Sequence, residues 1–114
     1  MRSPGSHARL QQSVERALDG ASQAAFTVLL SHRAQAFDYA ADLGTELTLS
    51  GHTHGFQMGL GGRSLFESLM PERYIWGHYS RGESQLYTTC GVGHWLPFRL
   101  GCPPEAPLIV LHKA

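Results

Sequence analysis

Apolar residues in the first part of the chain recur at a helical spacing. Leu10, Val14 and Leu18 are four residues apart and have polar residues between them. This pattern predicts an amphipathic helix over residues 6–19, which a glycine then ends. We expect residues 1–5, which include serine, proline and glycine, to form an irregular lead-in.

Three further patterns follow in the order strand, helix, strand. Residues 26–30 form a continuous apolar run, which is typical of a strand covered on both faces. Residues 34–43 carry apolar side chains at helical spacing before Gly44, which favours a helix with a glycine C-cap. Leu47-Thr48-Leu49 begins the next strand. This order predicts a βαβ unit, whose right-handed crossover sets its two strands parallel and adjacent.

The second half of the chain has weaker patterns. Four glycines over residues 55–62 indicate a loop, and residues 63–69 are compatible with one or two helical turns. Residues 73–79 and 85–89 predict a β-hairpin, and residues 106–111 predict a closing strand. The expected fold class is therefore α/β (α+β), with one βαβ unit followed by a β-hairpin and a closing strand.

Composition restricts the partners that we expect. The 114 residues suffice for one domain, and nine cationic residues balance nine acidic residues. Because only Lys113 is a lysine and no basic patch is evident, nucleic acid is an improbable partner. No apolar run is long enough to span a bilayer and no signal pattern is present, so we expect a soluble, cytoplasmic chain. Cys90 and Cys102 predict reduced thiols rather than a disulfide framework.

Three histidines follow the two strands of the βαβ unit. His52 and His54 come directly after the second strand, and in an extended backbone residues i and i+2 project to the same side. A solvated turn would show the same His-x-His pattern. However, His32 follows the first strand, and parallel neighbours end at the same edge of a sheet. The three imidazoles are therefore expected to converge into a metal site.

Several segments together resemble the calcineurin-like metallophosphoesterases, in particular the branch of bacterial membrane-associated phosphodiesterases of the YkuE and YaeI type. The resemblance runs from about residue 25 to residue 112, and Phe56 stands where the family usually has a second glycine. The segments are Leu29-Leu30-Ser31-His32, the Gly-His-Thr-His block within residues 49–57, Gly77-His78-Tyr79, Leu86-Tyr87 and residues 97–105.

The resemblance implies phosphoester hydrolysis at two divalent metal ions, commonly Mn, Fe or Zn. A water or hydroxide that bridges the ions attacks phosphorus in line. By resemblance His32 and His52 would bind the second metal, and His54 would bind the first.

Three other residues are weaker candidates for contact with the substrate. His78 and His94 could line the cleft, although a surface or hydrogen-bonded histidine is the commoner case. Arg99 could bind a phosphate in a bidentate way, or it could instead hold its own loop through backbone carbonyls.

The family's ligands from its N-terminal half are missing from this sequence. The chain has no Asp-x-His motif and no asparagine, and its three aspartates are Asp19, Asp38 and Asp42, away from the expected strand ends. Three neutral imidazoles cannot hold two divalent ions together, because no bridging carboxylate offsets the repulsion between the ions. We therefore expect residues 1–114 to be a fragment, the C-terminal half of a metallophosphoesterase domain.

Three hypotheses follow for the function. The chain is part of a phosphoester hydrolase, or a binding module in which the histidines hold a single zinc ion, or a structural relic. Its partners would be a phosphoester substrate and either a complementary N-terminal half or a second copy. Missing strands would leave a sheet edge and apolar surface exposed. Metal stoichiometry separates the hypotheses, since two ions per chain favour a complemented enzyme, one ion favours the binding module and none favours the relic.

Overall fold

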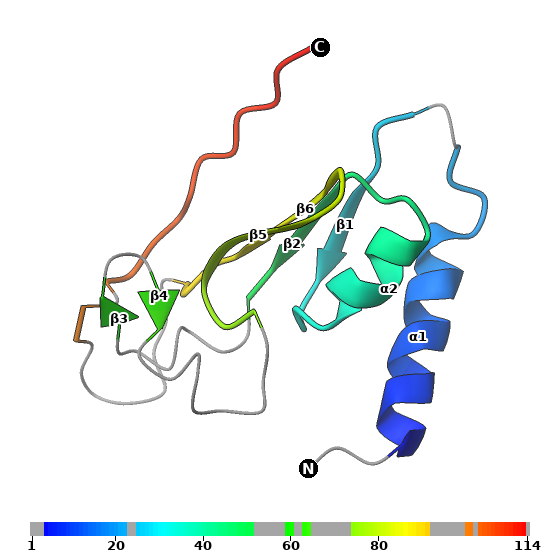
Figure 1. Ribbon diagram of the computed structural model, residues 1–114, viewed down its shortest axis with the longest axis horizontal. Coiled ribbons are helices and arrows are strands. Elements are labelled where there is room, and N and C mark those ends of the chain that lie inside the picture. The colour runs from blue at the N-terminus through cyan, green and yellow to red at the C-terminus, as the bar shows by residue number, and fades with distance from the viewer. Residues whose placement is uncertain are drawn as a thin grey trace.

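The protein, seen here as a computed structural model, is a four-stranded sheet with two helices on one side (Figure 1). The structure describes residues 4–22, 25–51, 59–60, 63–64, 74–91, 100–101 and 103–113. The elements are α1 (Pro4–Leu18), β1 (Val28–Ser31), α2 (Ala36–Asp42), β2 (Leu47–Ser50), β3 (Gly59–Leu60), β4 (Arg63–Ser64), β5 (Gly77–Arg81) and β6 (Ser84–Thr88). Within these ranges no helix is long and apolar enough to cross a membrane.

The amphipathic helix α1 packs on the helix α2 as its periodicity predicts. Val14 is buried against Leu29 of β1, and Leu10 and Leu18 pack around the same cluster. The helix begins at Pro4, so the expected irregular lead-in through residue 5 is wrong at its last two positions. A proline fits the first helical turn because the N–H that it lacks would have no helical partner there.

The predicted βαβ unit is confirmed. β1 and β2 pair in parallel with Val28 opposite Leu47, and α2 connects them. Phe37 on α2 is almost completely buried and packs with Leu86 on the sheet. The helix ends before Gly44, whose φ of 80° lies in the left-handed region that glycine adopts most easily.

The first strand is not covered on both faces, which corrects the expectation from its apolar run. Leu29 faces the helices and is 8% exposed, whereas Val28 is 41% exposed and Leu30 is 75% exposed. These two side chains point to the other face of the sheet, because successive residues of a strand alternate. The apolar run supplies side chains that could be buried on both faces of β1. Among the described residues, however, no second layer covers Val28 and Leu30.

The predicted hairpin is confirmed with shifted ends. β5 and β6 pair antiparallel with Arg81 opposite Ser84, and Gly82 takes a φ of 60° in the turn between them. β6 also pairs in parallel with β2, which gives the strand order β1-β2-β6-β5. The hairpin therefore extends the βαβ sheet, and the carboxyl ends of β1, β2 and β6 share one edge.

Two expectations for the second half are wrong. Residues 106–111 form no strand, because they run as an extended segment that pairs with no strand in the described part of the chain (Figure 1). Ile109 and Leu111 line a hollow together with side chains of the sheet. Residues 63–64 do not begin a helix but form the strand β4. This strand pairs antiparallel with β3, which lies inside residues 55–62, the stretch expected to be a loop. Residues 65–69 of the expected helical turns lie outside the described residues. The dipeptide Gly61-Gly62 between β3 and β4 is a hairpin signal that the loop interpretation overlooked.

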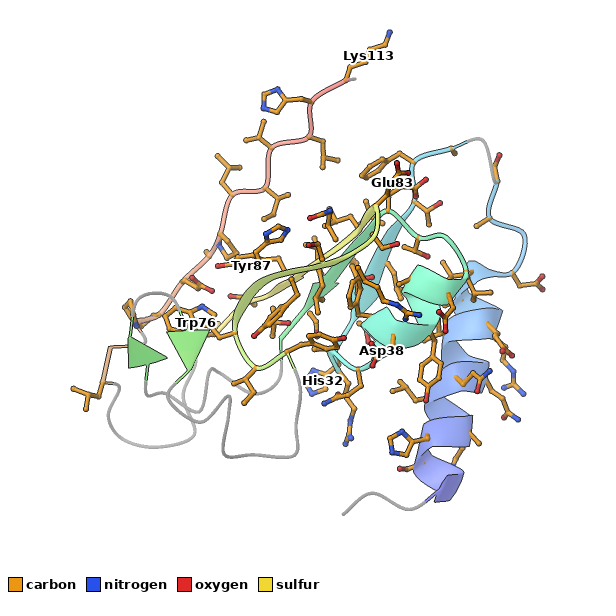
Figure 2. All side chains as sticks on the ribbon, in the orientation of Figure 1. His32, Asp38, Trp76, Glu83, Tyr87 and Lys113 are labelled. Atoms are coloured by element: carbon orange, nitrogen blue, oxygen red, sulfur yellow. The ribbon has the colours of Figure 1, made fainter. Side chains whose placement is uncertain are left out.

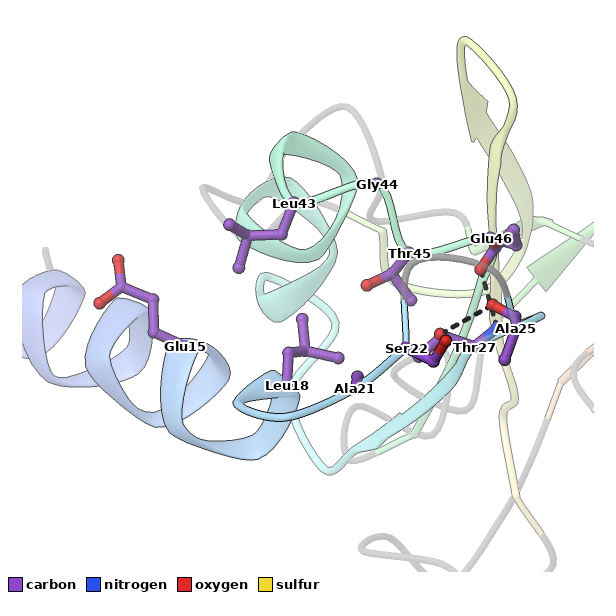
Figure 3. Close-up of a pocket in the computed structure, with 10 residues that line it drawn as sticks. All are labelled: Glu15, Leu18, Ala21, Ser22, Ala25, Thr27, Leu43, Gly44, Thr45 and Glu46. Atoms are coloured by element: carbon purple, nitrogen blue, oxygen red, sulfur yellow. Dashed lines mark hydrogen bonds between the residues drawn. The ribbon is translucent and has the colours of Figure 1, made fainter.

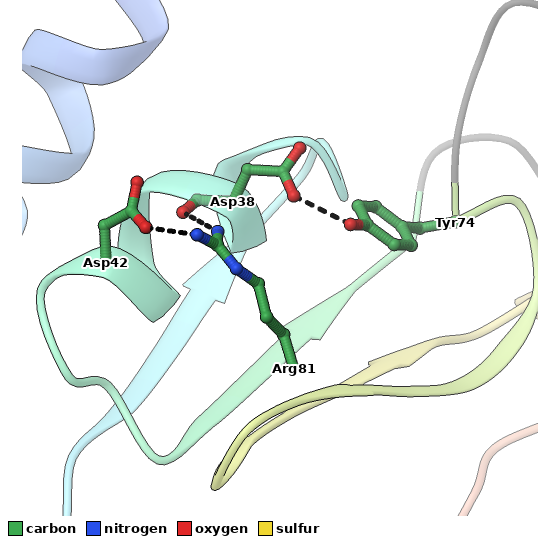
Figure 4. Close-up of polar contacts among 4 residues, drawn as sticks. All are labelled: Asp38, Asp42, Tyr74 and Arg81. Carbon is green, nitrogen blue, oxygen red and sulfur yellow. Dashed lines mark hydrogen bonds and ion pairs between the residues drawn. The ribbon is translucent and has the colours of Figure 1, made fainter.

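Polar contacts hold the hairpin against α2 (Figure 4). The Tyr74 hydroxyl donates a hydrogen bond of 2.7 Å to Asp38 Oδ1. Arg81 donates a hydrogen bond of 3.0 Å to the Asp38 carbonyl and forms an exposed ion pair with Asp42. The Tyr74 ring also packs edge-on against Phe37, with ring centroids 5.5 Å apart. Both aspartates therefore serve the packing of the fold.

We expect Tyr74→Phe to lower the free energy of unfolding by about 1 kcal/mol, because it removes the hydrogen bond to Asp38 and keeps the ring contacts. Urea denaturation would measure the loss. Tyr39→Phe is the matched control, since no hydrogen bond of the Tyr39 hydroxyl is found among the described residues. Equal stabilities of the two variants would contradict a role for the Tyr74 hydroxyl.

Candidate metal centre at the strand ends

Three hydroxyl side chains form a row where the parallel strands end. Ser31, Ser50 and Thr88 are the last residues of β1, β2 and β6, and they lie opposite one another in the register of the sheet. All three point to the side of the sheet that carries the helices, because Leu29 and Leu86, two positions earlier in their strands, pack there. The row marks the edge at which the sequence places its candidate ligands.

His32 lies at this edge, one residue beyond β1. Figure 2 labels its exposed side chain at the end of the sheet where β1 terminates. The Ser50 hydroxyl contacts the His32 carbonyl at 3.4 Å, so the end of β2 lies against the residue that follows β1. Gly51 then leads directly toward His52, and a Cβ on Gly51 would meet the nearest atom of Thr89 at 3.6 Å. The predicted convergence of the two strand ends is therefore present in the backbone.

The other predicted ligands lie outside the described residues. His52 and His54 belong to residues 52–58, and the substrate candidates His94 and Arg99 belong to residues 92–99. Within the described ranges no three His, Cys, Asp or Glu side chains are grouped closely enough to hold a metal ion. The metal centre thus stays a prediction. The structure gives the position of His32 and of Gly51, the residue before His52.

Glu105 is the residue near this edge that the sequence did not single out. Its carboxylate accepts hydrogen bonds from Trp76 Nε1 at 2.9 Å and from the Cys90 backbone N–H at 3.1 Å. The hydroxyls of Tyr87 and Thr89 donate to it as well, at 3.1 Å each to Oε1. We call this set of contacts the Glu105 clamp. It joins the extended segment to the end of β6, and no local pattern could have revealed it, since its members lie far apart in sequence.

The charge of Glu105 is stabilised by its donors. Partial burial raises the pKa of its carboxyl, but the hydrogen bonds from Cys90, Trp76, Thr89 and Tyr87 outweigh that effect and leave the pKa below its usual value. Conversely, partial burial and the neighbouring Glu105 charge raise the pKa of Tyr87 to about 12. Glu105 is therefore an ionised acceptor whose Oε1 is fully engaged within the fold, whereas its Oε2 accepts only from the Tyr87 hydroxyl at 3.2 Å.

His78 lies on β5, opposite Tyr87 of β6, on the face of the sheet turned away from the helices. Its Nε2 is 2.5 Å from Gln85 Oε1, so an exposed hydrogen bond already engages one ring nitrogen. His78 is the second residue of β5, and the first residue, Gly77, lies opposite Thr88 of β6. A contact with substrate stays a prediction for this residue.

A hollow of about 180 Å³ lies at the opposite end of the sheet (Figure 3). It opens between the end of α1 and the residues that lead into β1 and β2, and Leu18 and Leu43 line it. Glu46 at its rim accepts a hydrogen bond of 2.8 Å from the Thr27 backbone N–H. Because it adjoins the amino ends of the strands, this hollow is separate from the candidate metal centre.

Comparison with known proteins gives one relevant relative. Over 86 residues the chain is 36% identical to phosphodiesterase YaeI of Escherichia coli (strain K12), and the match covers 74% of this chain. It covers 32% of that protein, so the chain spans about a third of the length of this relative. No family model matches the sequence, and no solved structure gives a significant match. The chain is therefore similar, over most of its own length, to part of a phosphodiesterase.

Proposed function

We propose that this chain is one part of a metal-dependent phosphodiesterase of the calcineurin-like family, with His32, His52 and His54 as metal ligands. One observation carries the proposal: β1 and β2 are adjacent and parallel, with Ser31 opposite Ser50, so the residues that follow them leave the sheet side by side. The similarity to a phosphodiesterase supports the reaction class. The substrate would be a phosphoester.

The ligand set of the chain fits one part of such a centre. His32 is exposed at the strand ends, and neutral imidazole is a good ligand for Mn, Fe or Zn. The two divalent ions of the complete centre would supply an activated hydroxide and would offset the charge that develops on the phosphoryl oxygens. The role of this chain's own residues would be to hold its share of the ions and to position the phosphoester, with His78, His94 and Arg99 as substrate contacts.

A bridging carboxylate would have to come from elsewhere. Asp38 and Asp42 are engaged with Tyr74 and Arg81, and Glu105 is engaged by the clamp. Asp38, Asp42 and Glu105 are thus poorly placed to join two cations, which supports the view that the chain is one part of the centre. This same observation favours the second candidate function, a module that holds a single zinc ion through three imidazoles.

Metal titration of the purified chain tests the ligand assignment. Without a complementary part, the chain should bind one Zn²⁺ at pH 7.5, as the single-zinc module also would, and only two ions per chain in a complemented form would favour the hydrolase. The affinity should fall at least about tenfold at pH 5.5, because imidazoles take up protons near pH 6.5 and protons compete for the same nitrogens. Isothermal calorimetry with Zn²⁺ would give both the stoichiometry and the affinity.

The variant His32→Ala should lose this binding, and His112→Ala is the matched control because His112 is exposed beside Lys113, at the end of the molecule opposite His32 (Figure 2). Binding that is equal at both pH values, or that survives in His32→Ala, would show that other groups bind the ion. No binding at all would leave the structural relic as the better reading of the chain.

A further inference from the structure

A hollow of about 360 Å³ lies between α1 and the turn that follows β1. Four of the side chains that line it come from one face of α1, because they stand at positions i, i+3, i+4 and i+7 of the helix. Arg33 lines it from the turn after β1. We call this site the basic hollow. Its described lining residues, none of which is acidic, are Ser6, His7, Arg9, Leu10, Ser13 and Arg33.

The two arginines of the basic hollow have no carboxylate partner in the described part of the chain. Arg9 Nε donates a hydrogen bond of 3.2 Å to the Gly5 carbonyl, which is the contact that its guanidinium makes among the described residues. The exposed Arg33 side chain forms no ion pair with a described residue, unlike Arg81, which pairs with Asp42. Because two cations that share a hollow repel each other, an anion bound between them would stabilise the arrangement.

The basic hollow adjoins the candidate metal centre. Arg33 directly follows His32, and consecutive Cα atoms are about 3.8 Å apart. The Ser31 hydroxyl donates a hydrogen bond of 2.8 Å to the Arg33 carbonyl, so the turn that carries Arg33 is held against the end of β1. In Figure 2 the first half of α1 lies toward the same end of the molecule as His32. A group bound in the basic hollow would therefore lie beside a substrate held at His32.

The donors of the basic hollow suit a phosphate group. A guanidinium donates two parallel hydrogen bonds to the oxygens of a phosphate or a carboxylate. A phosphate monoester carries a charge of about −1.5 to −2 at pH 7 and three acceptor oxygens, so one such group can engage both Arg9 and Arg33, and a carboxylate has fewer oxygens and less charge. The His7 imidazole can add a ring N–H donor. A long polyanion is a poorer fit, because the chain carries no formal net charge.

We propose that the basic hollow binds a terminal phosphate group of the substrate, so that the substrates are phosphodiesters that carry a further phosphate. This inference rests on the proposed function and names its substrate class. The phosphodiester would lie at the metal centre near His32, and Arg9 and Arg33 would hold the terminal phosphate beside it. The hollow would bind and orient the substrate, and no bond forms or breaks there. The sequence shows no basic patch at this place, because the two arginines are far apart along the chain and meet only in the fold.

An NMR titration of the isotope-labelled 114-residue chain with methyl phosphate tests the hollow by itself, in buffer freed of metal ions by a chelating resin. We expect the amide signals of Arg9 and Arg33 to shift. Arg9→Gln and Arg33→Gln should each weaken the affinity at least about tenfold, because each removes charged hydrogen bonds. Arg16→Gln is the matched control, since it removes the same charge from an exposed position of α1 outside the hollow. Absence of binding, an affinity that neither variant weakens, or equally tight binding of acetate would overturn the proposal.

A second titration, of the chain loaded with one equivalent of Zn²⁺, distinguishes a phosphate on the substrate from free phosphate. Its probes are the dinucleotide TpT and pTpT, which differ by one 5′-terminal phosphate. We expect pTpT to bind at least about tenfold more tightly than either TpT or methyl phosphate, and Arg33→Gln to remove its advantage over TpT. Equal affinities for pTpT and methyl phosphate would mean that the hollow takes free phosphate, and would overturn the substrate assignment. Failure to bind Zn²⁺, with binding of methyl phosphate intact, would refute the proposed function and leave the phosphate site standing.

Discussion

His54→Ala should abolish metal-dependent hydrolysis of an aryl phosphodiester by this chain in its complemented form. By resemblance His54 would bind the first of two metals, and loss of this ligand would remove both the activated hydroxide that the metals would supply and the charge that would stabilise the transition state. Metal ions contribute several kcal/mol to such reactions, so the rate should fall by about a thousandfold or more. Release of p-nitrophenolate from bis(p-nitrophenyl) phosphate with added Mn²⁺ would measure it.

The control for His54→Ala is His112→Ala, which removes an exposed imidazole at the end of the molecule opposite His32 and should retain the wild-type rate. A wild-type rate in His54→Ala would refute the ligand assignment. The isolated chain should show no turnover, because Asp38, Asp42 and Glu105 are engaged in contacts of the fold and the family's Asp-x-His motif is not in the sequence. Turnover by the isolated chain that vanishes in His54→Ala would instead mean that three histidines with other ligands suffice, and that the chain is not an incomplete centre.

The parts of the fold that the sequence predicts are those determined by nearby residues. The spacing of Leu10, Val14 and Leu18 identifies α1, and the short run of strand, helix and strand determines the parallel pairing of β1 and β2. The pairing of β6 with β2 joins residues far apart in the chain, and no local pattern contains it. The candidate site follows the same division, since the strand ends were predictable and the Glu105 clamp was not.

The expected burial of residues 26–30 on both faces and the expected strand at residues 106–111 fail for one physical cause. Residues 26–30 and 106–111 are apolar enough to belong to a two-layered structure, and the sequence records that requirement without showing where the second layer is. In the structure Leu30 and Leu108 are exposed instead. An apolar pattern indicates which side chains a segment can bury. It does not indicate which other part of the structure would cover them.

Glu105→Ala should destabilise the fold by about 3 kcal/mol, because it leaves the donors on Trp76 and Cys90 without their acceptor in a partly buried site. Glu105→Gln should cost less, since it retains an acceptor oxygen and loses the charge. Urea denaturation followed by far-ultraviolet circular dichroism would measure the loss. Glu83→Ala, at an exposed turn position, is the control and should change stability by less than about 0.5 kcal/mol.

The pH dependence of stability tests the charge of Glu105 separately. Its pKa in the folded chain is below the usual 4.5, so ionisation stabilises the fold fully above pH 4.5 and this contribution is lost as the pH falls through the folded-state pKa. The wild type should therefore lose more stability than Glu105→Gln as the pH is lowered below 4.5. If the wild type and Glu105→Gln lost equal stability below pH 4.5, the clamp would not stabilise the ionised form of the Glu105 carboxyl over the protonated form. An effect of Glu105→Ala no larger than that of Glu83→Ala would mean that the clamp does not hold the extended segment to the end of β6.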